Sequence, residues 1–265
     1  MRVNIGDHIG WNIFLRGYFD VVPSLVAMVL KDARPDAFYL DVGANIGDTS
    51  IAASMRGIQT IGIDASLIAI AELSHNVSLN SPVPYTLVHC AVAAASRTWT
   101  GNRQSDYLRI RVPMGNTGAA SVTTNWNACK SSDVELMALP RTVTEIADSF
   151  GIDTVLLIKL DVEGAERAAL LGMQPLLAKQ HCPVLFEYIV NHRDATGFRL
   201  VDLLPTGYIC YAISCEAGLE SATLRLSSFD RDTTYENVLA VYESLPQSLQ
   251  LAQSPAGLKV LVDRS

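Results

Sequence analysis

The chain has 265 residues, of which 49% are hydrophobic and 18% are charged, so it can bury the core of one large α/β domain or two small ones. Its formal net charge of −7 excludes a general nucleic-acid binder, because phosphate contacts require a basic face. The five cysteines lack C-x-x-C spacing, and no apolar run reaches the roughly 18 residues of a membrane span. We therefore expect a cytoplasmic protein that acts on a small molecule, without nucleic-acid or membrane partners.

Residues 1–35 are predicted to form an N-terminal helical cap or lid. Four aromatic residues lie between positions 11 and 19, and residues 23–31 have helical character. Such an aromatic cluster either packs against the core or covers a substrate. The sequence leaves both interpretations open.

A strand, a tight turn and a helix come next. The apolar run 38–42 contains Asp41, is followed by Gly43 and Gly47, and leads into a helix that Gly57 ends. Glycines in such a turn let the backbone approach a ligand, and the helix N-terminus offers unpaired N–H groups. A ligand site is therefore predicted where this strand ends.

Strands and helices then alternate. A second strand, 59–63, ends at Asp64, a helix runs from its cap Ser66 to about Leu79, and residues 85–92 form a third strand. Short connections between such elements predict a Rossmann-like α/β fold with a mostly parallel sheet and helices on both faces. Ligands of such sheets bind at the carboxyl ends of the strands.

Residues 101–140 interrupt this alternation and are predicted to be an irregular insertion. The stretch from Met114 to Trp126 is rich in Gly, Ser, Thr and Asn, which is typical of a loop. Long polar loops inside compact domains are usually functional or mobile. We therefore interpret the insertion as a possible substrate loop, with Asn125 as a candidate substrate residue.

Four further strands bring the predicted sheet to seven. The main domain is expected over residues 36–245, without an internal boundary, and residues 246–265 are expected to form a C-terminal tail. The predicted strands are residues 154–160, 184–186, 208–213 and 236–242.

Acidic residues end four of the predicted strands: Asp41, Asp64, Asp161 and Glu187. The carboxyl ends of parallel strands share one edge, where a partly desolvated carboxylate is costly unless a ligand compensates it. Asp64 follows Gly43 by about twenty residues, the spacing at which an acid accepts hydrogen bonds from ribose hydroxyls. A nucleoside-containing cofactor is the leading hypothesis.

The residues of the turn after the first strand indicate which class of nucleotide site it can form. The fingerprint G-x-G-x-x-G seats a pyrophosphate on a helix N-terminus, but Asn45 stands here where the second glycine belongs. A P-loop is excluded because no Gly-Lys-Ser/Thr follows the turn. Asp48 is interpreted first as a helix N-cap and second as a cofactor contact.

The pattern Asp41-x-Gly-x-x-x-Gly47, with an acid after the second strand, resembles the first motif of class I S-adenosylmethionine-dependent methyltransferases. Later runs narrow the resemblance to the FkbM-type family of that class. They are Asn76 and Asn80, Ile158-Lys-Leu-Asp-Val-Glu-Gly-Ala-Glu166, Phe186-Glu187 and Glu236-Asn-Val-Leu-Ala240.

This resemblance implies a class I methyltransferase fold and an O-methyltransferase. The enzyme would move a methyl group from S-adenosylmethionine to a hydroxyl of a sugar moiety or of a secondary metabolite such as a polyketide, leaving S-adenosylhomocysteine. Asp64 would then hold the ribose, and the backbone at Cys90 and Ala91 the adenine. The amino-acid end would lie against Asp41, Gly43, Asn45 and Gly47.

Methyl transfer to an alcohol is an in-line displacement in which the hydroxyl must also lose its proton. Asp161 and Glu163 are the leading candidates for substrate positioning and proton acceptance, and His192 is a third candidate base. Glu187 and Tyr188 are candidate substrate residues.

Three alternatives stay open. In the first, the acids near Asp161 form a capping and salt-bridge cluster with Lys159 or Arg167; a divalent ion held by them is not specified by their spacing. In the second, the chain is an NAD(P)-dependent Rossmann oxidoreductase, and in the third it is a non-catalytic binding module with the methyltransferase fold.

Overall fold

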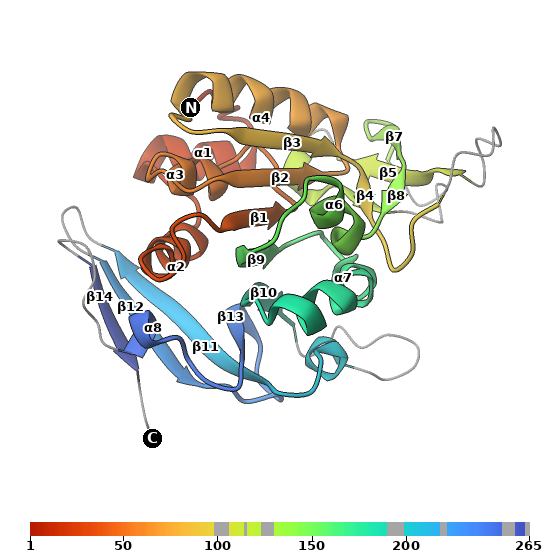
Figure 1. Cartoon of the computed structure of the whole chain (residues 1–265). Helices are drawn as coiled ribbons and strands as arrows, with labels where there is room; N and C mark the ends of the chain where they lie inside the picture. Colours follow the sequence, from red (N-terminus) through yellow and green to blue (C-terminus); the bar gives the residue numbers. More distant parts are fainter. Residues whose placement is uncertain are drawn as a thin grey trace.

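The computed structural model describes residues 1–97, 106–113, 116–122, 130–189, 199–217, 222–250 and 258–262 (Figure 1). Its centre is a nine-stranded sheet in the order β14-β12-β11-β13-β10-β9-β1-β2-β3. The strands are β1 Phe38–Val42, β2 Thr60–Asp64, β3 Tyr85–His89, β9 Val155–Leu160, β10 Val184–Tyr188, β11 Tyr208–Ala217, β12 Ala222–Ser228, β13 Tyr235–Tyr242 and β14 Leu258–Val262.

The sheet is mixed rather than simply parallel. The five strands from β3 to β10 pair in parallel, and β13 lies antiparallel between β10 and β11. Beyond β11, β12 is antiparallel to it and β14 is parallel to β12. The prediction of seven strands is therefore corrected to nine.

The two additional strands have different origins. In β12, Leu224 and Leu226 are buried while Thr223 and Arg225 point away from the core, a two-residue alternation that the sequence analysis overlooked. β14 comes from residues 246–265, which were expected to be only a tail. Its pairing with β12 places Leu258 and Val260 in the core, a long-range contact that the local sequence does not indicate.

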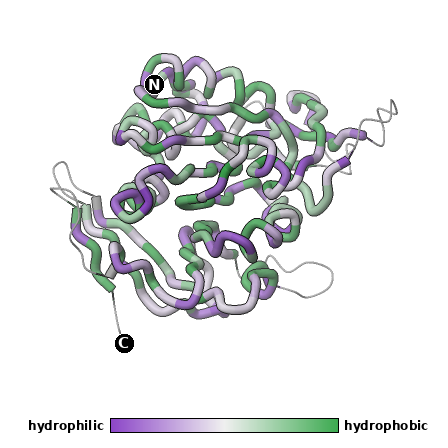
Figure 2. Tube along the Cα trace, viewed as in Figure 1, coloured by the Kyte–Doolittle hydropathy of each residue, from purple (hydrophilic) through white to green (hydrophobic). Residues whose placement is uncertain are grey.

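Helices pack on both faces of the sheet, and hydrophobic residues line its central strands (Figure 2). Residues of α6 and α7 cover one face, and residues of α2, α3 and α8 cover the other. Among the helices described, none combines the length and the apolarity needed to span a membrane. The helices are α1 His8–Arg16, α2 Val22–Lys31, α3 Ser50–Ser54, α4 Leu67–Asn80, α6 Val143–Ser149, α7 Glu166–Gln180 and α8 Gln247–Gln250, with 3-10 turns η1 Thr117–Ala119 and η3 Leu200–Leu203.

The N-terminal segment divides into two parts. α2 is a core helix, because Val26 and Ala27 are fully buried against the sheet. α1 instead exposes Trp11, Phe14 and Leu15. Within residues 1–35, α2 thus belongs to the core, and a lid stays a prediction for the part before it.

Asn76 ties the start of the chain to the turn after β1. Its buried side chain accepts a hydrogen bond from the backbone N–H of Arg2 (2.6 Å) and donates to the carbonyls of Arg2 and Ile46 (3.1 Å each). Asn80 donates one turn back, to the carbonyl of Asn76 (2.7 Å). These two asparagines, which carried part of the family resemblance, thus have structural contacts.

The insertion contains regular structure. β5 Leu108–Val112 pairs antiparallel with β6 Ser121–Val122 and β7 Val134–Ala138, and β4 Ala91–Val92 pairs in parallel with β8 Pro140–Arg141. The insertion is therefore only partly irregular, and the predicted loop from Met114 to Trp126 follows one of its strands, β5. Buried Ile110, Val112 and Ala138 pack against Ala91, so the small sheet closes over the end of β4.

Candidate active site

A cavity opens at the carboxyl ends of β1, β2 and β9, the edge that the sequence predicts for a ligand. Its wall combines residues from the turn after β1, the N-terminal segment, the small sheet of the insertion and the turn after β9. Of the predicted site residues, it includes Gly43, Asn45, Asp48, Asp64, Cys90, Ala91, Asp161 and Glu163.

The turn after β1 has a backbone that requires glycine. Gly43 has φ +87°, and a Cβ placed there would lie 1.6 Å from the carbonyl oxygen of Asp161. The same close approach brings the ends of β1 and β9 together. Gly47, with φ +88°, does not line the cavity; a Cβ there would lie 2.5 Å from Leu73 Cδ1, so its role is packing.

Asp64 fixes the conformation of this turn. Its Oδ2 accepts a hydrogen bond from the backbone N–H of Asn45 (2.9 Å), and its Oδ1 accepts one from that of Ser66 (2.7 Å). Burial raises the pKa of Asp64, although these two hydrogen bonds oppose the shift. A carboxylate has about four lone-pair sites, so acceptors remain for the predicted ribose hydroxyls.

Asn45 carries an unsatisfied acceptor at the cavity. Its backbone has a left-handed conformation, φ +46°, and its Oδ1 is buried without a hydrogen-bond partner in the described part of the chain. An unpaired buried acceptor costs roughly 1–3 kcal/mol, which a donor on a ligand would offset. Because Asn45 lines the cavity, this atom is a candidate acceptor for a ligand.

Lys159 connects the ends of two strands. Its Nζ lies 3.5 Å from Asp41 Oδ1 and 3.2 Å from Asp161 Oδ2, and it donates to the carbonyl oxygen of Gly43 (3.2 Å). Burial alone lowers the pKa of Lys159, but the carboxylates, led by Asp161 and Asp41, outweigh it and raise the net pKa. The alternative in which Asp161 pairs with Lys159 is confirmed.

Asp41 lies below the cavity wall. It is fully buried, and its Oδ2 accepts a hydrogen bond from Thr49 Oγ1 (2.9 Å). With Lys159 on its other oxygen, its contacts are to the protein, so the structure places this predicted cofactor residue behind the turn rather than on the surface of the cavity.

Asp48 faces the cavity and is not an N-cap. α3 begins at Ser50 with Thr49 as the capping residue, and no side-chain capping bond forms there. The N-cap interpretation is therefore wrong. Burial raises the pKa of Asp48 to about 7, with Lys159 opposing the shift.

The turn after β9 presents Glu163 to the cavity. Glu163 and Gly164 both have positive φ, +49° and +95°, and Glu166 Oε1 accepts hydrogen bonds from the backbone N–H groups of Gly164 (3.1 Å) and Val162 (3.3 Å). Partial burial, together with the charge of Asp161 and of other acids nearby, raises the pKa of Glu163. Within the described residues, no cation forms an ion pair with it.

Cys90 and Ala91 form an apolar wall at the other end of the cavity. Both are buried, and burial raises the pKa of the Cys90 thiol to about 12, so the thiol stays neutral. The insertion adds Ile110 and Ala120 to this wall. Sequence reasoning did not identify these two residues, because only the pairing of β5 with its neighbours brings them here.

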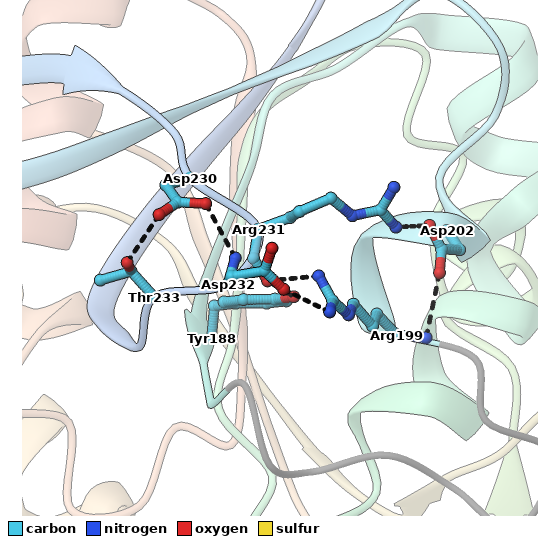
Figure 3. A network of polar contacts seen from close by, with 7 residues as sticks. All are labelled: Tyr188, Arg199, Asp202, Asp230, Arg231, Asp232 and Thr233. Atoms are coloured by element: carbon cyan, nitrogen blue, oxygen red, sulfur yellow. Dashed lines mark hydrogen bonds and ion pairs between the residues drawn. The ribbon is translucent and has the colours of Figure 1, made fainter.

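Two predicted substrate residues lie away from this wall. Glu187 and Tyr188 follow one another in β10 and do not line the cavity, although the charge of Glu187 raises the pKa of Glu163. Tyr188 donates from its hydroxyl to the carbonyl of Arg231 (2.8 Å), and Arg199 donates to the same oxygen (2.6 Å). Figure 3 shows the surrounding network, in which Asp202, Asp230, Asp232 and Thr233 take part.

His192 and Asn125 lie outside the described residues, so their predicted roles stay predictions. Within the described residues, no group of three His, Cys, Asp or Glu side chains could hold a metal ion.

Four residues of the N-terminal segment line the cavity: His8, Ile9, Phe19 and Asp20. Phe19 belongs to the predicted aromatic cluster, whereas sequence reasoning missed the other three. Asp20 precedes a helix with Pro23 near its start, a pattern that indicates a helix cap and nothing more. In the structure the N-cap residue of α2 is Val21, and Asp20 Oδ1 accepts a hydrogen bond from the backbone N–H of Val22 (2.9 Å). Its place at the cavity depends on tertiary packing.

Comparison with known protein families gives a match to the Methyltransferase FkbM domain over residues 41–210. The chain belongs to this family. The matched segment contains the turn after β1, Asp64, Lys159 and the turn after β9, and the family resemblance predicted from the motifs is thus confirmed. A comparison with curated protein sequences gave no match.

Solved structures similar to the FkbM chain described here include methyltransferase FkbM from Methylobacillus flagellatus KT, with 18% identity and a TM-score of 0.41 over 78% of this chain and 44% of that one. An O-methyltransferase from Bacillus cereus in complex with SAH is 9% identical, with a TM-score of 0.41 over 84% and 82% of the two chains. Magnesium protoporphyrin IX methyltransferase from Synechocystis PCC 6803 with bound SAM is 13% identical, with a TM-score of 0.36 over 90% and 93%. The chain thus spans less than half of the FkbM protein from Methylobacillus, and the family assignment rests on the match over residues 41–210.

Replacing Lys159 by Met is expected to lower the free energy of unfolding by about 3–5 kcal/mol, because it leaves Asp41 buried without its cation. Urea denaturation measures the change. The control is Lys179→Met on the exposed side of α7, which should stay within about 0.5 kcal/mol of the parent protein. A loss below about 1 kcal/mol for Lys159→Met would show that the cation does not hold these strand ends together.

Replacing Asp48 by Asn is expected to stabilise the protein above pH 7 but not at pH 4. The folded-state pKa of about 7 exceeds the ordinary 3.8, so stability falls as the pH rises between these values, and the variant lacks this loss. We expect a gain of about 1–2 kcal/mol at pH 8, less than the full shift implies because water reaches the cavity. Urea denaturation at pH 4, 6 and 8 tests this, with exposed Asp36→Asn as control. The same pH dependence in both variants would contradict it.

Proposed function

We propose that this chain transfers a methyl group from S-adenosylmethionine to a hydroxyl group of a small molecule, such as a sugar moiety or a secondary metabolite. Membership of the FkbM methyltransferase family supports methyl transfer. The observation that carries the cofactor assignment is the turn after β1, where Asp64 holds the backbone and Asn45 Oδ1 is left without a donor. S-adenosylmethionine has the ribose hydroxyls and the ammonium donors that such acceptors require.

The charge of the cavity favours this cofactor over NAD. Five acids line it, and Lys159 is the one lysine or arginine among the described lining residues. The acids are Asp20, Asp48, Asp64, Asp161 and Glu163. Such an excess of carboxylates attracts a ligand that carries a sulfonium and an ammonium, and repels a pyrophosphate with two negative charges. The side chain of Asn45 also occupies the position where a dinucleotide turn needs glycine.

The residues present fit S-adenosylmethionine along the length of the cavity. Asp64 would accept hydrogen bonds from the ribose, and the apolar wall of Cys90, Ala91, Ile110 and Ala120 would flank the adenine. Gly43 and Asn45 would contact the amino-acid end. When bound, the cofactor supplies a methyl group activated by its sulfonium.

Of the two candidate bases that lie in the described part of the chain, Asp161 and Glu163, the second is the better placed. Asp161 forms an ion pair with Lys159 at 3.2 Å, so its carboxylate is already engaged with a cation of the protein. The pKa of Glu163 is raised by partial burial and by its acidic neighbours, which makes its carboxylate the stronger base. We assign the removal of the hydroxyl proton to Glu163 and the positioning of the acceptor to Asp161.

Isothermal titration calorimetry with S-adenosylmethionine, S-adenosylhomocysteine, NAD and NADP on the same sample tests the cofactor. The charge of the cavity and the free acceptor on Asn45 predict binding of the first two and no measurable binding of the nicotinamide nucleotides. Binding of NAD or NADP alone would instead indicate an oxidoreductase.

Replacing Glu163 by Gln is expected to lower the rate of methyl transfer by about 100-fold or more, the usual scale for loss of a general base. The affinity for S-adenosylhomocysteine should change little. The measurement is transfer from methyl-labelled S-adenosylmethionine to hydroxyl compounds found by screening. Asp153→Asn, at the amino end of β9, is the control and should keep the parent rate. Cofactor binding without transfer to any acceptor would favour a binding module.

A further inference from the structure

Two hydrogen bonds hold the carboxylate of Asp20, one from a neighbouring residue and one from a residue far along the chain. Its Oδ1 accepts the hydrogen bond from the backbone N–H of Val22 (2.9 Å), and Asn237 Nδ2 on β13 donates to its Oδ2 (3.4 Å). Asn237 belongs to the run Glu236-Asn-Val-Leu-Ala240, which the sequence analysis singled out without giving it a role. The two contacts fix the carboxylate at the wall of the cavity.

The position of Asp20 relates it to the amino-acid end of the proposed cofactor. It lines the same cavity as Gly43 and Asn45, and the charges of Lys159 and Asp161 act on its carboxylate. Lys159 in turn contacts the carbonyl oxygen of Gly43. Asp20 therefore lies on the β1–β9 side of the cavity, whereas Cys90 and Ala91 form the wall on the β2–β4 side.

Among the described residues at this end of the cavity, Lys159 is the one lysine or arginine that faces several acids. Lys159 already contacts the carboxylates of Asp41 and Asp161, so its single positive charge does not also neutralise the carboxylate of Asp20. Asn45 Oδ1 adds a buried acceptor without a donor. An ammonium group placed here would supply both a positive charge and several N–H donors.

We propose that the carboxylate of Asp20 binds the α-ammonium group of S-adenosylmethionine and S-adenosylhomocysteine, and that Asn237 is the positioning residue that aims this carboxylate. The inference rests on the proposed function. It gives the N-terminal segment a direct part in cofactor binding, beyond the residues of the family motifs.

The test compares two ligands that differ at this end of the cofactor. S-adenosylhomocysteine carries the α-ammonium, and 5′-methylthioadenosine keeps the adenosine and sulfur but lacks the amino-acid part. Calorimetry with both ligands is performed on the parent protein, Asp20→Asn, Asn237→Ala and Asp64→Asn. Asp20→Asn keeps an acceptor for Val22 and removes the charge, together with the acceptor for Asn237 Nδ2. Thermal unfolding checks that each variant is folded.

Asp20→Asn should weaken S-adenosylhomocysteine binding by roughly 10- to 100-fold and leave 5′-methylthioadenosine binding within about twofold of the parent value. Asn237→Ala should weaken only S-adenosylhomocysteine, by roughly 3- to 10-fold. Asp64→Asn, at the ribose, should weaken both ligands. Asp7→Asn is the matched control, because Asp7 caps α1 through the N–H of Ile9 (3.0 Å) but does not line the cavity, and it should change neither affinity.

Unchanged S-adenosylhomocysteine affinity in folded Asp20→Asn would overturn the inference while the proposed function stands. Equal weakening of both ligands would also overturn it, since Asp20 would then act on the whole cavity. A parent protein that binds neither ligand would overturn the proposed function, and this inference with it.

Discussion

The ammonium of Lys159 holds together the edge of the sheet on which the site is built. It connects the carboxylates of Asp41 and Asp161, at the ends of β1 and β9, and the carbonyl oxygen of Gly43. Without this cation, two adjacent strands would end in carboxylates that repel each other, one of them fully buried. Gly43 approaches the backbone of Asp161 so closely that no side chain fits between them. The charge of Lys159 and the absence of a side chain at Gly43 therefore both hold the end of β1 against the end of β9.

Residues of the predicted motifs also stabilise the fold around the cavity. Asp64 accepts two backbone N–H groups and thereby sets the turn at Asn45, while Asn76 ties the carbonyl of Ile46 to the start of the chain. Preorganised turns of this kind lower the cost of ordering a site when a ligand binds. The structural and binding roles of Asp64 are compatible, because its carboxylate keeps lone pairs after both backbone bonds are made.

Much of this arrangement could be predicted from local sequence. The turn of Gly43, the acid at Asp64 and the buried strand before Asp161 depend on spacing and on the period of the apolar residues, which are local signals. β14 and the cavity position of Asp20 could not be predicted, because each depends on contacts distant in sequence: Asn237 lies 217 positions from Asp20. Asp48 was wrongly interpreted as a helix N-cap for a related reason. The local sequence pattern does not show that Thr49, rather than Asp48, occupies the N-cap position of α3.

The two ends of the cavity fix how a nucleoside cofactor would lie in it. Carboxylates and Lys159 gather on the β1–β9 side, and the apolar residues Cys90, Ala91, Ile110 and Ala120 gather on the other. A ligand with an ammonium at one end and an adenine at the other gains from both surfaces in one orientation and loses both contacts when reversed. In the proposed orientation, the sulfonium would face the part of the cavity that Glu163 lines. The acceptor hydroxyl would then enter from the side of the N-terminal segment and the insertion, where His8, Phe19 and Val122 line the cavity. These parts of the chain lie largely outside the motifs that identify the family, which is where selection among acceptors would be expected.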